Sequence, residues 1–78
     1  MPKFSPVSYK RLATVFEAEG FTHVRTEGDH MVFTKPGVIR PVVIPKYQEV
    51  PVFIIKNNLR TAGISRDRYF VLLGWEGA

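Results

Sequence analysis

The first apolar pattern in the chain has the spacing of one face of a helix. The residues that share this face are Tyr9, Leu12, Val15 and Phe16. Apolar side chains three and four residues apart lie on one side of an α-helix, so we expect a helix over residues 9–19. Ser8 is a favourable cap for its first turn, and Gly20 is a favourable stop. The same reasoning predicts a helix over residues 51–62 and a short terminal helix over residues 66–73.

Between the first two predicted helices, apolar and polar residues alternate, which is the pattern of β-strands. We expect strands over residues 21–27, 30–35 and 39–44. The dipeptide Gly28-Asp29 between the first two strands suits a tight two-residue hairpin turn. The pattern therefore predicts an α+β domain in the order αβββα with a short terminal helix. Its three-stranded antiparallel sheet would have helices on one face and would be open on the other.

The length of the hairpin turn decides which residues share a face of this sheet. A two-residue turn pairs Glu27 with His30 and Val24 with Phe33, and residues directly opposite each other point to the same side. We therefore expect a core face made of Val24, Met31, Phe33, Ile39, Pro41 and Val43. We expect the open face to carry His23, Arg25, Glu27, His30, Val32, Thr34, Arg40, Val42 and Ile44.

Composition limits the classes of protein to which the chain can belong. Its 78 residues suffice for a single domain, with residues 1–7 as a loose lead-in and residues 74–78 as a C-terminal tail. The lack of cysteine excludes disulfides and thiolate metal sites, and the two histidines lack the spacing of a metal-binding motif. The longest apolar run, residues 69–73, is too short to cross a membrane. We expect a cytoplasmic protein that needs no metal or other cofactor.

The charge of the chain points to a polyanionic partner. Eleven lysines and arginines against seven acidic residues give a formal net charge of +4. Such an excess on a small surface favours nucleic-acid binding, because released counterions add affinity. A solvated basic surface without a partner would explain the charge equally well.

Several motifs stand in the order and spacing of the HicA toxin family, which the chain resembles. They are Glu19-Gly20-Phe21, Gly28-Asp29-His30, Val43-Ile44-Pro45 and Leu59-Arg60-Thr61-Ala62-Gly63-Ile64. The resemblance implies a fold like that of double-stranded-RNA-binding domains. It also implies a type II toxin that cleaves mRNA without a metal, using one histidine, and that a HicB antitoxin holds inactive. The family's catalytic histidine corresponds to His30. The chain departs from the family at Lys46, where many relatives carry histidine, and at Phe53, where relatives often carry glycine.

The chemistry of RNA cleavage supports the same histidine. A base must take the proton of the 2′-hydroxyl and an acid must protonate the leaving oxygen, and an imidazole can do either. Arg25 and Arg40, on the same predicted face, would hold the phosphate and stabilise its charge. Glu27, opposite His30, would orient the imidazole or favour its protonated form.

Other candidate residues surround this predicted centre. His23, on the same predicted face, is a candidate second proton carrier. Lys46 and Lys10 are candidate phosphate ligands, and Gly28 and Asp29 form the turn that presents His30.

Two further interpretations stay open. One is a non-catalytic RNA-binding module, in which His30 is a solvated residue at a hairpin end. The other is an inactive relative that only binds an antitoxin. Three apolar residues are expected on the open face: Val32, Val42 and Ile44. Exposed apolar residues that lie together are usually covered by another segment or a partner protein. Either an antitoxin would bury them, or terminal residues through Trp75 would fold back over them.

Overall fold

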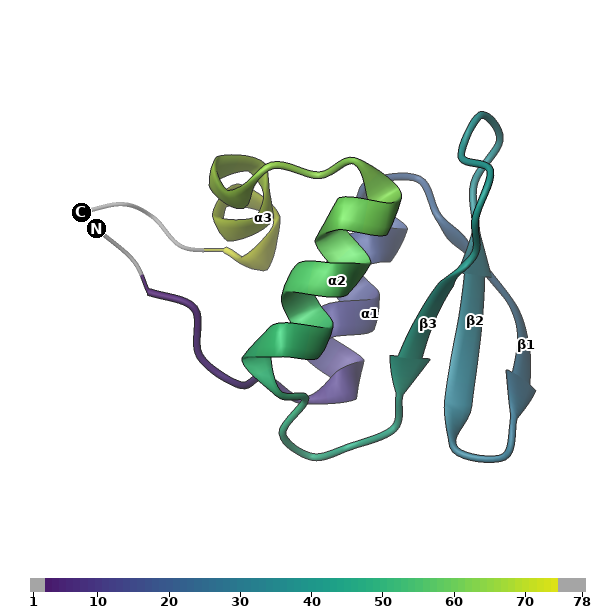
Figure 1. Ribbon diagram of the computed structural model, residues 1–78, viewed down its shortest axis with the longest axis horizontal. Helices are drawn as coiled ribbons and strands as arrows, with labels where there is room; N and C mark the ends of the chain where they lie inside the picture. The colour runs from purple at the N-terminus through teal and green to yellow at the C-terminus, as the bar shows by residue number, and fades with distance from the viewer. Residues whose placement is uncertain (1–2, 75–78) are drawn as a thin grey trace.

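The structure, a computed structural model, describes residues 3–74 of the chain. Its elements are α1 (Tyr9–Ala18), β1 (Thr22–Glu27), β2 (His30–Thr34), β3 (Val42–Pro45), α2 (Val52–Ala62) and α3 (Arg66–Leu73). The strands form one antiparallel sheet in the order β1-β2-β3. All three helices lie on one side of this sheet, with α3 farthest from it (Figure 1). The predicted α+β class, the order of elements and the one-sided helical cover are confirmed.

One apolar cluster fills the space between the sheet and the helices. Its members with an exposed fraction of 1% or less are Leu12, Val15, Phe16, Phe33, Val42, Ile44, Val50, Ile55 and Tyr69. Burying a side chain of this size contributes about 1.5–3 kcal/mol. This burial sets the orientation of the strands and hence of every side chain on the open face.

Serine caps and ion pairs fix the helices at their ends. The Ser8 hydroxyl accepts a hydrogen bond from the Arg11 amide at 3.2 Å, and the Ser65 hydroxyl accepts one from the Arg68 amide at 3.1 Å. Each cap satisfies an amide that has no partner within its own helix. The Arg68 guanidinium also contacts the Glu19 carboxylate at 2.9 Å, which ties α3 to the end of α1.

The segment before α1, expected to be a loose lead-in, contacts the core from Phe4 onward. The Phe4 ring stacks on the Tyr69 ring with centroids 5.5 Å apart. Val7 is buried, and its carbonyl accepts a hydrogen bond from the Val50 amide at 2.7 Å. The last part of the predicted tail, including Trp75, lies outside the described residues.

The pairing of β1 with β2 follows the prediction only as far as Arg25. Glu27 lies opposite His30 and Arg25 opposite Val32 as expected, but the register then shifts at a β-bulge, and His23 lies opposite Phe33. The expected pairing of Val24 with Phe33 is therefore wrong, and Val24 is 49% exposed. A bulge adds one residue to a strand, so the turn fixes the register only up to that point.

The predicted faces of β3 are reversed. Val42 and Ile44, expected on the open face, are fully buried, whereas Val43, expected in the core, is 38% exposed. The strand begins at Val42 rather than at residue 39, and the predicted inward residues Ile39 and Pro41 are exposed in the loop before it. A change of one residue in the phase of a strand moves every side chain to the other face.

This correction removes most of the apolar surface expected on the open face. Val32 lies on that face, opposite Arg25 and Val43, but it is only 4% exposed. Val42 and Ile44 belong to the core. An antitoxin or a folded-back tail is therefore not required to cover these three residues.

Two neighbouring substitutions test the register of β3. Val42→Asp should unfold the domain, because it would bury a carboxylate without a partner. Val43→Asp should change the free energy of unfolding by no more than about 1 kcal/mol, because the side chain faces solvent. Urea unfolding followed by circular dichroism measures the free energy of unfolding of each variant. Equal stability of the two variants would contradict the observed register.

Within the described residues, the Tyr69 hydroxyl is buried without a hydrogen-bond partner. Burial raises the pKa of Tyr69 above its ordinary value of 10.0, and the nearby charge of Arg11 opposes this only in part. Because the buried polar oxygen has lost its water without a replacement, it costs stability.

Removal of this hydroxyl should make the protein more stable. Tyr69→Phe should raise the free energy of unfolding by about 1 kcal/mol near neutral pH. The raised pKa means that the unfolded chain releases the phenolic proton first, so the wild type should lose stability as the pH rises through 10.0, and the variant should lose less. Urea unfolding at neutral and alkaline pH measures the difference, with Tyr47→Phe as the exposed control. An unchanged or lower stability of Tyr69→Phe would show that the hydroxyl has a partner.

Candidate active site

The hairpin turn between β1 and β2 presents His30 at the rim of the open face. Gly28 has a φ of 61°, the left-handed conformation that a tight hairpin turn requires. His30 is the first residue of β2 and lies opposite Glu27 on one side and Pro45 on the other. Its side chain is 50% exposed. The imidazole is therefore held by the sheet and is accessible to a large ligand.

Asp29, not Glu27, is the carboxylate that contacts this imidazole. Nδ1 of His30 lies 3.0 Å from Oδ1 of Asp29. The Glu27 carboxylate instead pairs with Nε of Arg25, so its expected role in orienting His30 is wrong. In a neutral imidazole that donates Nδ1–H to a carboxylate, the lone pair is on Nε2. The geometry therefore leaves Nε2 of His30 able to accept a proton.

The loop between β3 and α2 is tied to the same turn and brings Lys46 to it. The Lys46 amide donates a hydrogen bond to the Asp29 carbonyl at 2.7 Å, and its Nζ lies 5.8 Å from the centre of the Tyr9 ring. The Tyr9 amide donates to the Tyr47 carbonyl at 3.0 Å, which ties the start of α1 to this loop. Lys46 is therefore a neighbour of His30 through the backbone, as the sequence order alone could not show.

Two helices begin at this end of the molecule. The hairpin turn, the loop after β3 and the first turns of α1 and α2 all lie at the lower end in Figure 1. Neither first turn carries an acidic residue, and the exposed Lys10 lies in that of α1. Helix N-termini carry partial positive charge and attract phosphate groups. Lys46 lies in the same loop as the exposed Glu49, and Asp29 and Glu27 flank the hairpin turn, so lysines, helix N-termini and carboxylates all lie at this end.

The structure separates two predicted site residues from His30. Arg40 lies in the loop before β3, at the opposite end of the sheet, and at least the length of β3, about 10 Å, lies between them. The bulge in β1 places His23 opposite the buried Phe33, with ring centroids 5.2 Å apart, and Nε2 of His23 lies 2.9 Å from the Thr26 hydroxyl. The expectation that either residue shares a face with His30 is wrong.

Arg25 does share the open face with His30, since it lies opposite Val32. Its guanidinium is paired with Glu27, so a bound phosphate would compete with that carboxylate. The sequence reasoning missed the contact of Asp29 with the imidazole and the exposed Tyr47 beside Lys46. The first could have been suspected from the direct adjacency of Asp29 and His30, whereas nothing in the sequence places residue 47 at this end.

Two classes of site find no support in the described part of the chain. Residues 3–74 contain no group of three or more histidine, cysteine and acidic side chains that could hold a metal ion. No helix in that range is long and apolar enough to cross a membrane.

Comparison with known protein families gives one match. The model of a family described as the HicA toxin of bacterial toxin–antitoxin systems matches residues 9–64. This range runs from the start of α1 past the end of α2 and includes Asp29, His30 and Lys46. No curated protein matches the chain significantly. The chain belongs to the HicA family of toxins from bacterial toxin–antitoxin systems.

Proposed function

We propose that this toxin is a metal-independent RNA endonuclease, an mRNA interferase, in which His30 is the single catalytic histidine. One observation carries the proposal. The half-exposed imidazole of His30 has its Nδ1 held by Asp29, which leaves Nε2 free to accept a proton, and it lies at the end of the molecule where α1 and α2 begin. Family membership supports a toxin, and the proposed activity is the chemistry that this site can perform.

The proposed reaction is an attack by the RNA on its own backbone. Nε2 of His30 removes the proton of a 2′-hydroxyl, and the resulting oxygen attacks the adjacent phosphorus. The bond from phosphorus to the 5′-oxygen breaks, and that oxygen takes a proton from solvent. The products are a 2′,3′-cyclic phosphate and a 5′-hydroxyl. No second histidine shares this face among the described residues, so one imidazole serves as the base.

Lys46 and Lys10 are the cations proposed to stabilise the extra charge on the phosphate. Lys46 is anchored to the backbone of Asp29, and Lys10 lies in the first turn of α1. Charged groups that are already in place when negative charge develops are the most effective form of such stabilisation. Single-stranded RNA is the proposed substrate, because its backbone can adapt to a small protruding turn.

The remaining features of the proposal concern the cellular setting. The whole chain would act as one domain in the cytoplasm, where mRNA is available. A HicB-type antitoxin is the proposed protein partner that holds the toxin inactive. Membership of a toxin–antitoxin family supports an antitoxin partner in general, and the HicB type is our specific proposal.

Replacement of His30 tests the enzyme activity. His30→Ala should lower the rate of cleavage of a labelled RNA by at least about a hundredfold in buffer with chelator, because a general base contributes that much or more. Its fold should be unchanged, since the side chain lies at the exposed rim. His23→Ala is the matched control and should cleave at the wild-type rate. Wild-type cleavage by His30→Ala would remove the catalytic claim, and RNA binding without cleavage by the wild type would support a non-catalytic module.

Two carboxylates next to His30 allow a test of its orientation. Asp29→Ala should shift the imidazole proton from Nδ1 toward Nε2 and slow cleavage, because the acceptor that holds Nδ1–H is removed. Glu27→Ala should leave the tautomer and the cleavage rate unchanged, because Glu27 pairs with Arg25. Nitrogen NMR of the histidine rings reports the tautomer directly. The opposite result, a shift in Glu27→Ala and none in Asp29→Ala, would rule out the proposed role of Asp29.

A further inference from the structure

Two of the six arginines have no partner for their guanidinium group among residues 3–74. The other four are engaged: Arg11 with the Leu73 carbonyl, Arg25 with Glu27, Arg66 with Asp67 and Arg68 with Glu19. Arg40 and Arg60 form no hydrogen bond or ion pair through their side chains with any described residue. They come from different elements, the loop before β3 and the last turn of α2, and both are exposed.

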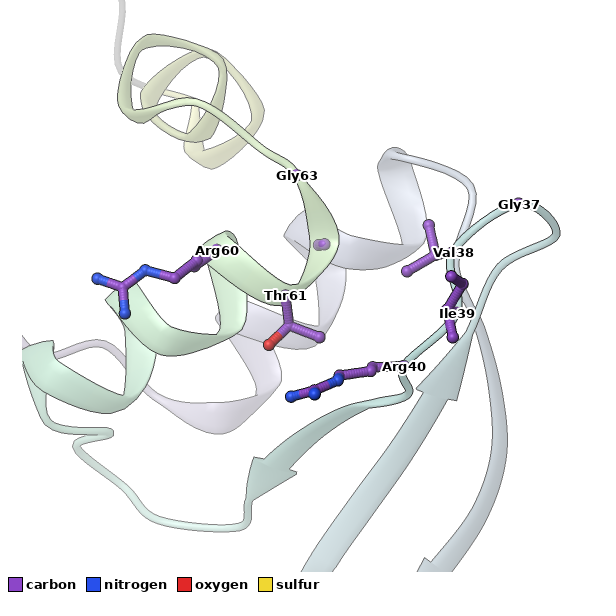
Figure 2. A pocket seen from close by; sticks show the side chains of 8 residues that line it. Gly37, Val38, Ile39, Arg40, Arg60, Thr61 and Gly63 are labelled. Atoms are coloured by element: carbon purple, nitrogen blue, oxygen red, sulfur yellow. The ribbon is translucent and has the colours of Figure 1, made fainter.

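These two arginines line the same groove. It has a volume of about 340 Å³ and lies between the β2–β3 loop and the C-terminal end of α2. Figure 2 shows Arg40 reaching from the loop toward Thr61, while the side chain of Arg60, the residue before Thr61 in α2, extends away from the loop. None of the residues that line this arginine groove is acidic or aromatic. The groove is therefore an open surface with Arg40 reaching across it, Arg60 at its helical edge and no acidic residue in its lining.

The chemistry of the lining decides which ligand fits. A guanidinium group binds carboxylates and phosphates through paired hydrogen bonds, so both a protein and an RNA offer suitable oxygens. The rest of the lining is uncharged, and its larger aliphatic side chains are Val38, which is half-buried, and Ile39, which is 98% exposed. Arginine is enriched in protein interfaces, whereas single-stranded RNA is held by aromatic side chains that stack on its bases. The groove therefore favours a protein over an RNA.

The position of the groove also separates it from the candidate active site. Arg40 lies at the opposite end of the sheet from His30, so a protein bound there would not need to displace RNA from the hairpin turn. The charge of an acidic segment would be complementary to that of the groove, which steers association and fixes the orientation of a partner.

We propose that the arginine groove docks an acidic peptide segment of a partner protein, with carboxylates on Arg40 and Arg60 and an apolar side chain against Ile39. A protein partner is expected because the chain belongs to a toxin–antitoxin family, and this expectation does not depend on the proposed chemistry of His30. The docking site would give the partner an anchor that is independent of the active site. Binding at this site alone would leave the imidazole accessible.

A labelled peptide of alternating glutamate and leucine is the probe for this site. Fluorescence anisotropy with the full chain should show that Arg40→Glu and Arg60→Glu each weaken binding at least about tenfold, because each loses a charge-assisted contact. Ile39→Ser should also weaken it. Lys56→Glu, the same charge change one turn earlier on α2, is the matched control and should have an effect of no more than about threefold. A peptide with glutamine in place of glutamate should not bind.

The outcomes separate this proposal from the enzyme proposal. Absence of peptide binding by the wild type, or equal binding by the groove variants and the control, would overturn the docking site. So would a loss of binding to labelled oligoadenylate in Arg40→Glu and Arg60→Glu with unchanged peptide binding, since the groove would then be an RNA site. The groove variants should cleave RNA at the wild-type rate. If the wild type binds the peptide through these arginines but cleaves no RNA, the docking site stands and the enzyme proposal fails.

Discussion

Phe33 occupies the centre of the sheet and is fully buried, and its burial decides which way the other side chains of β2 point. Side chains of a strand alternate between faces, so His30, three residues earlier, must lie on the face opposite to Phe33. The pairing of Phe33 with Val42 extends the same constraint to β3 and places Val42 and Ile44 in the core. The exposure of the imidazole is therefore a consequence of the packing of the hydrophobic core.

The hairpin turn converts this exposure into a defined geometry. Asp29 contacts the imidazole through its side chain and accepts a hydrogen bond from Lys46 through its carbonyl. One residue thus links the imidazole to the loop that leads into α2. The start of α1 joins the same loop through the hydrogen bond between Tyr9 and Tyr47. The turn, the loop and the start of α1 are consequently held together by backbone contacts, whereas the orientation of the imidazole depends on the Asp29 side chain.

The sequence was sufficient for features that local residues determine. Helical spacing, the serine caps and the Gly28-Asp29 turn are encoded within a few residues, so the elements and their order could be predicted. The faces of β3 could not, because residues 35–41 form a loop and the phase of the strand depends on its pairing with β2. The bulge at Val24 carries no signal in the sequence, and it moved His23 to the core side. The family resemblance identified His30 as a candidate, but it could not show which carboxylate contacts it.

The proposed chemistry depends most directly on Nε2 of His30 taking a proton from an RNA 2′-hydroxyl. Mass spectrometry of the ends of RNA cut by the wild-type chain in the presence of a chelator tests this step. We predict a 2′,3′-cyclic phosphate on one product and a 5′-hydroxyl on the other. Products that end in a 5′-phosphate and a 3′-hydroxyl would contradict the mechanism, because water, and not the neighbouring 2′-oxygen, would then have attacked the phosphorus.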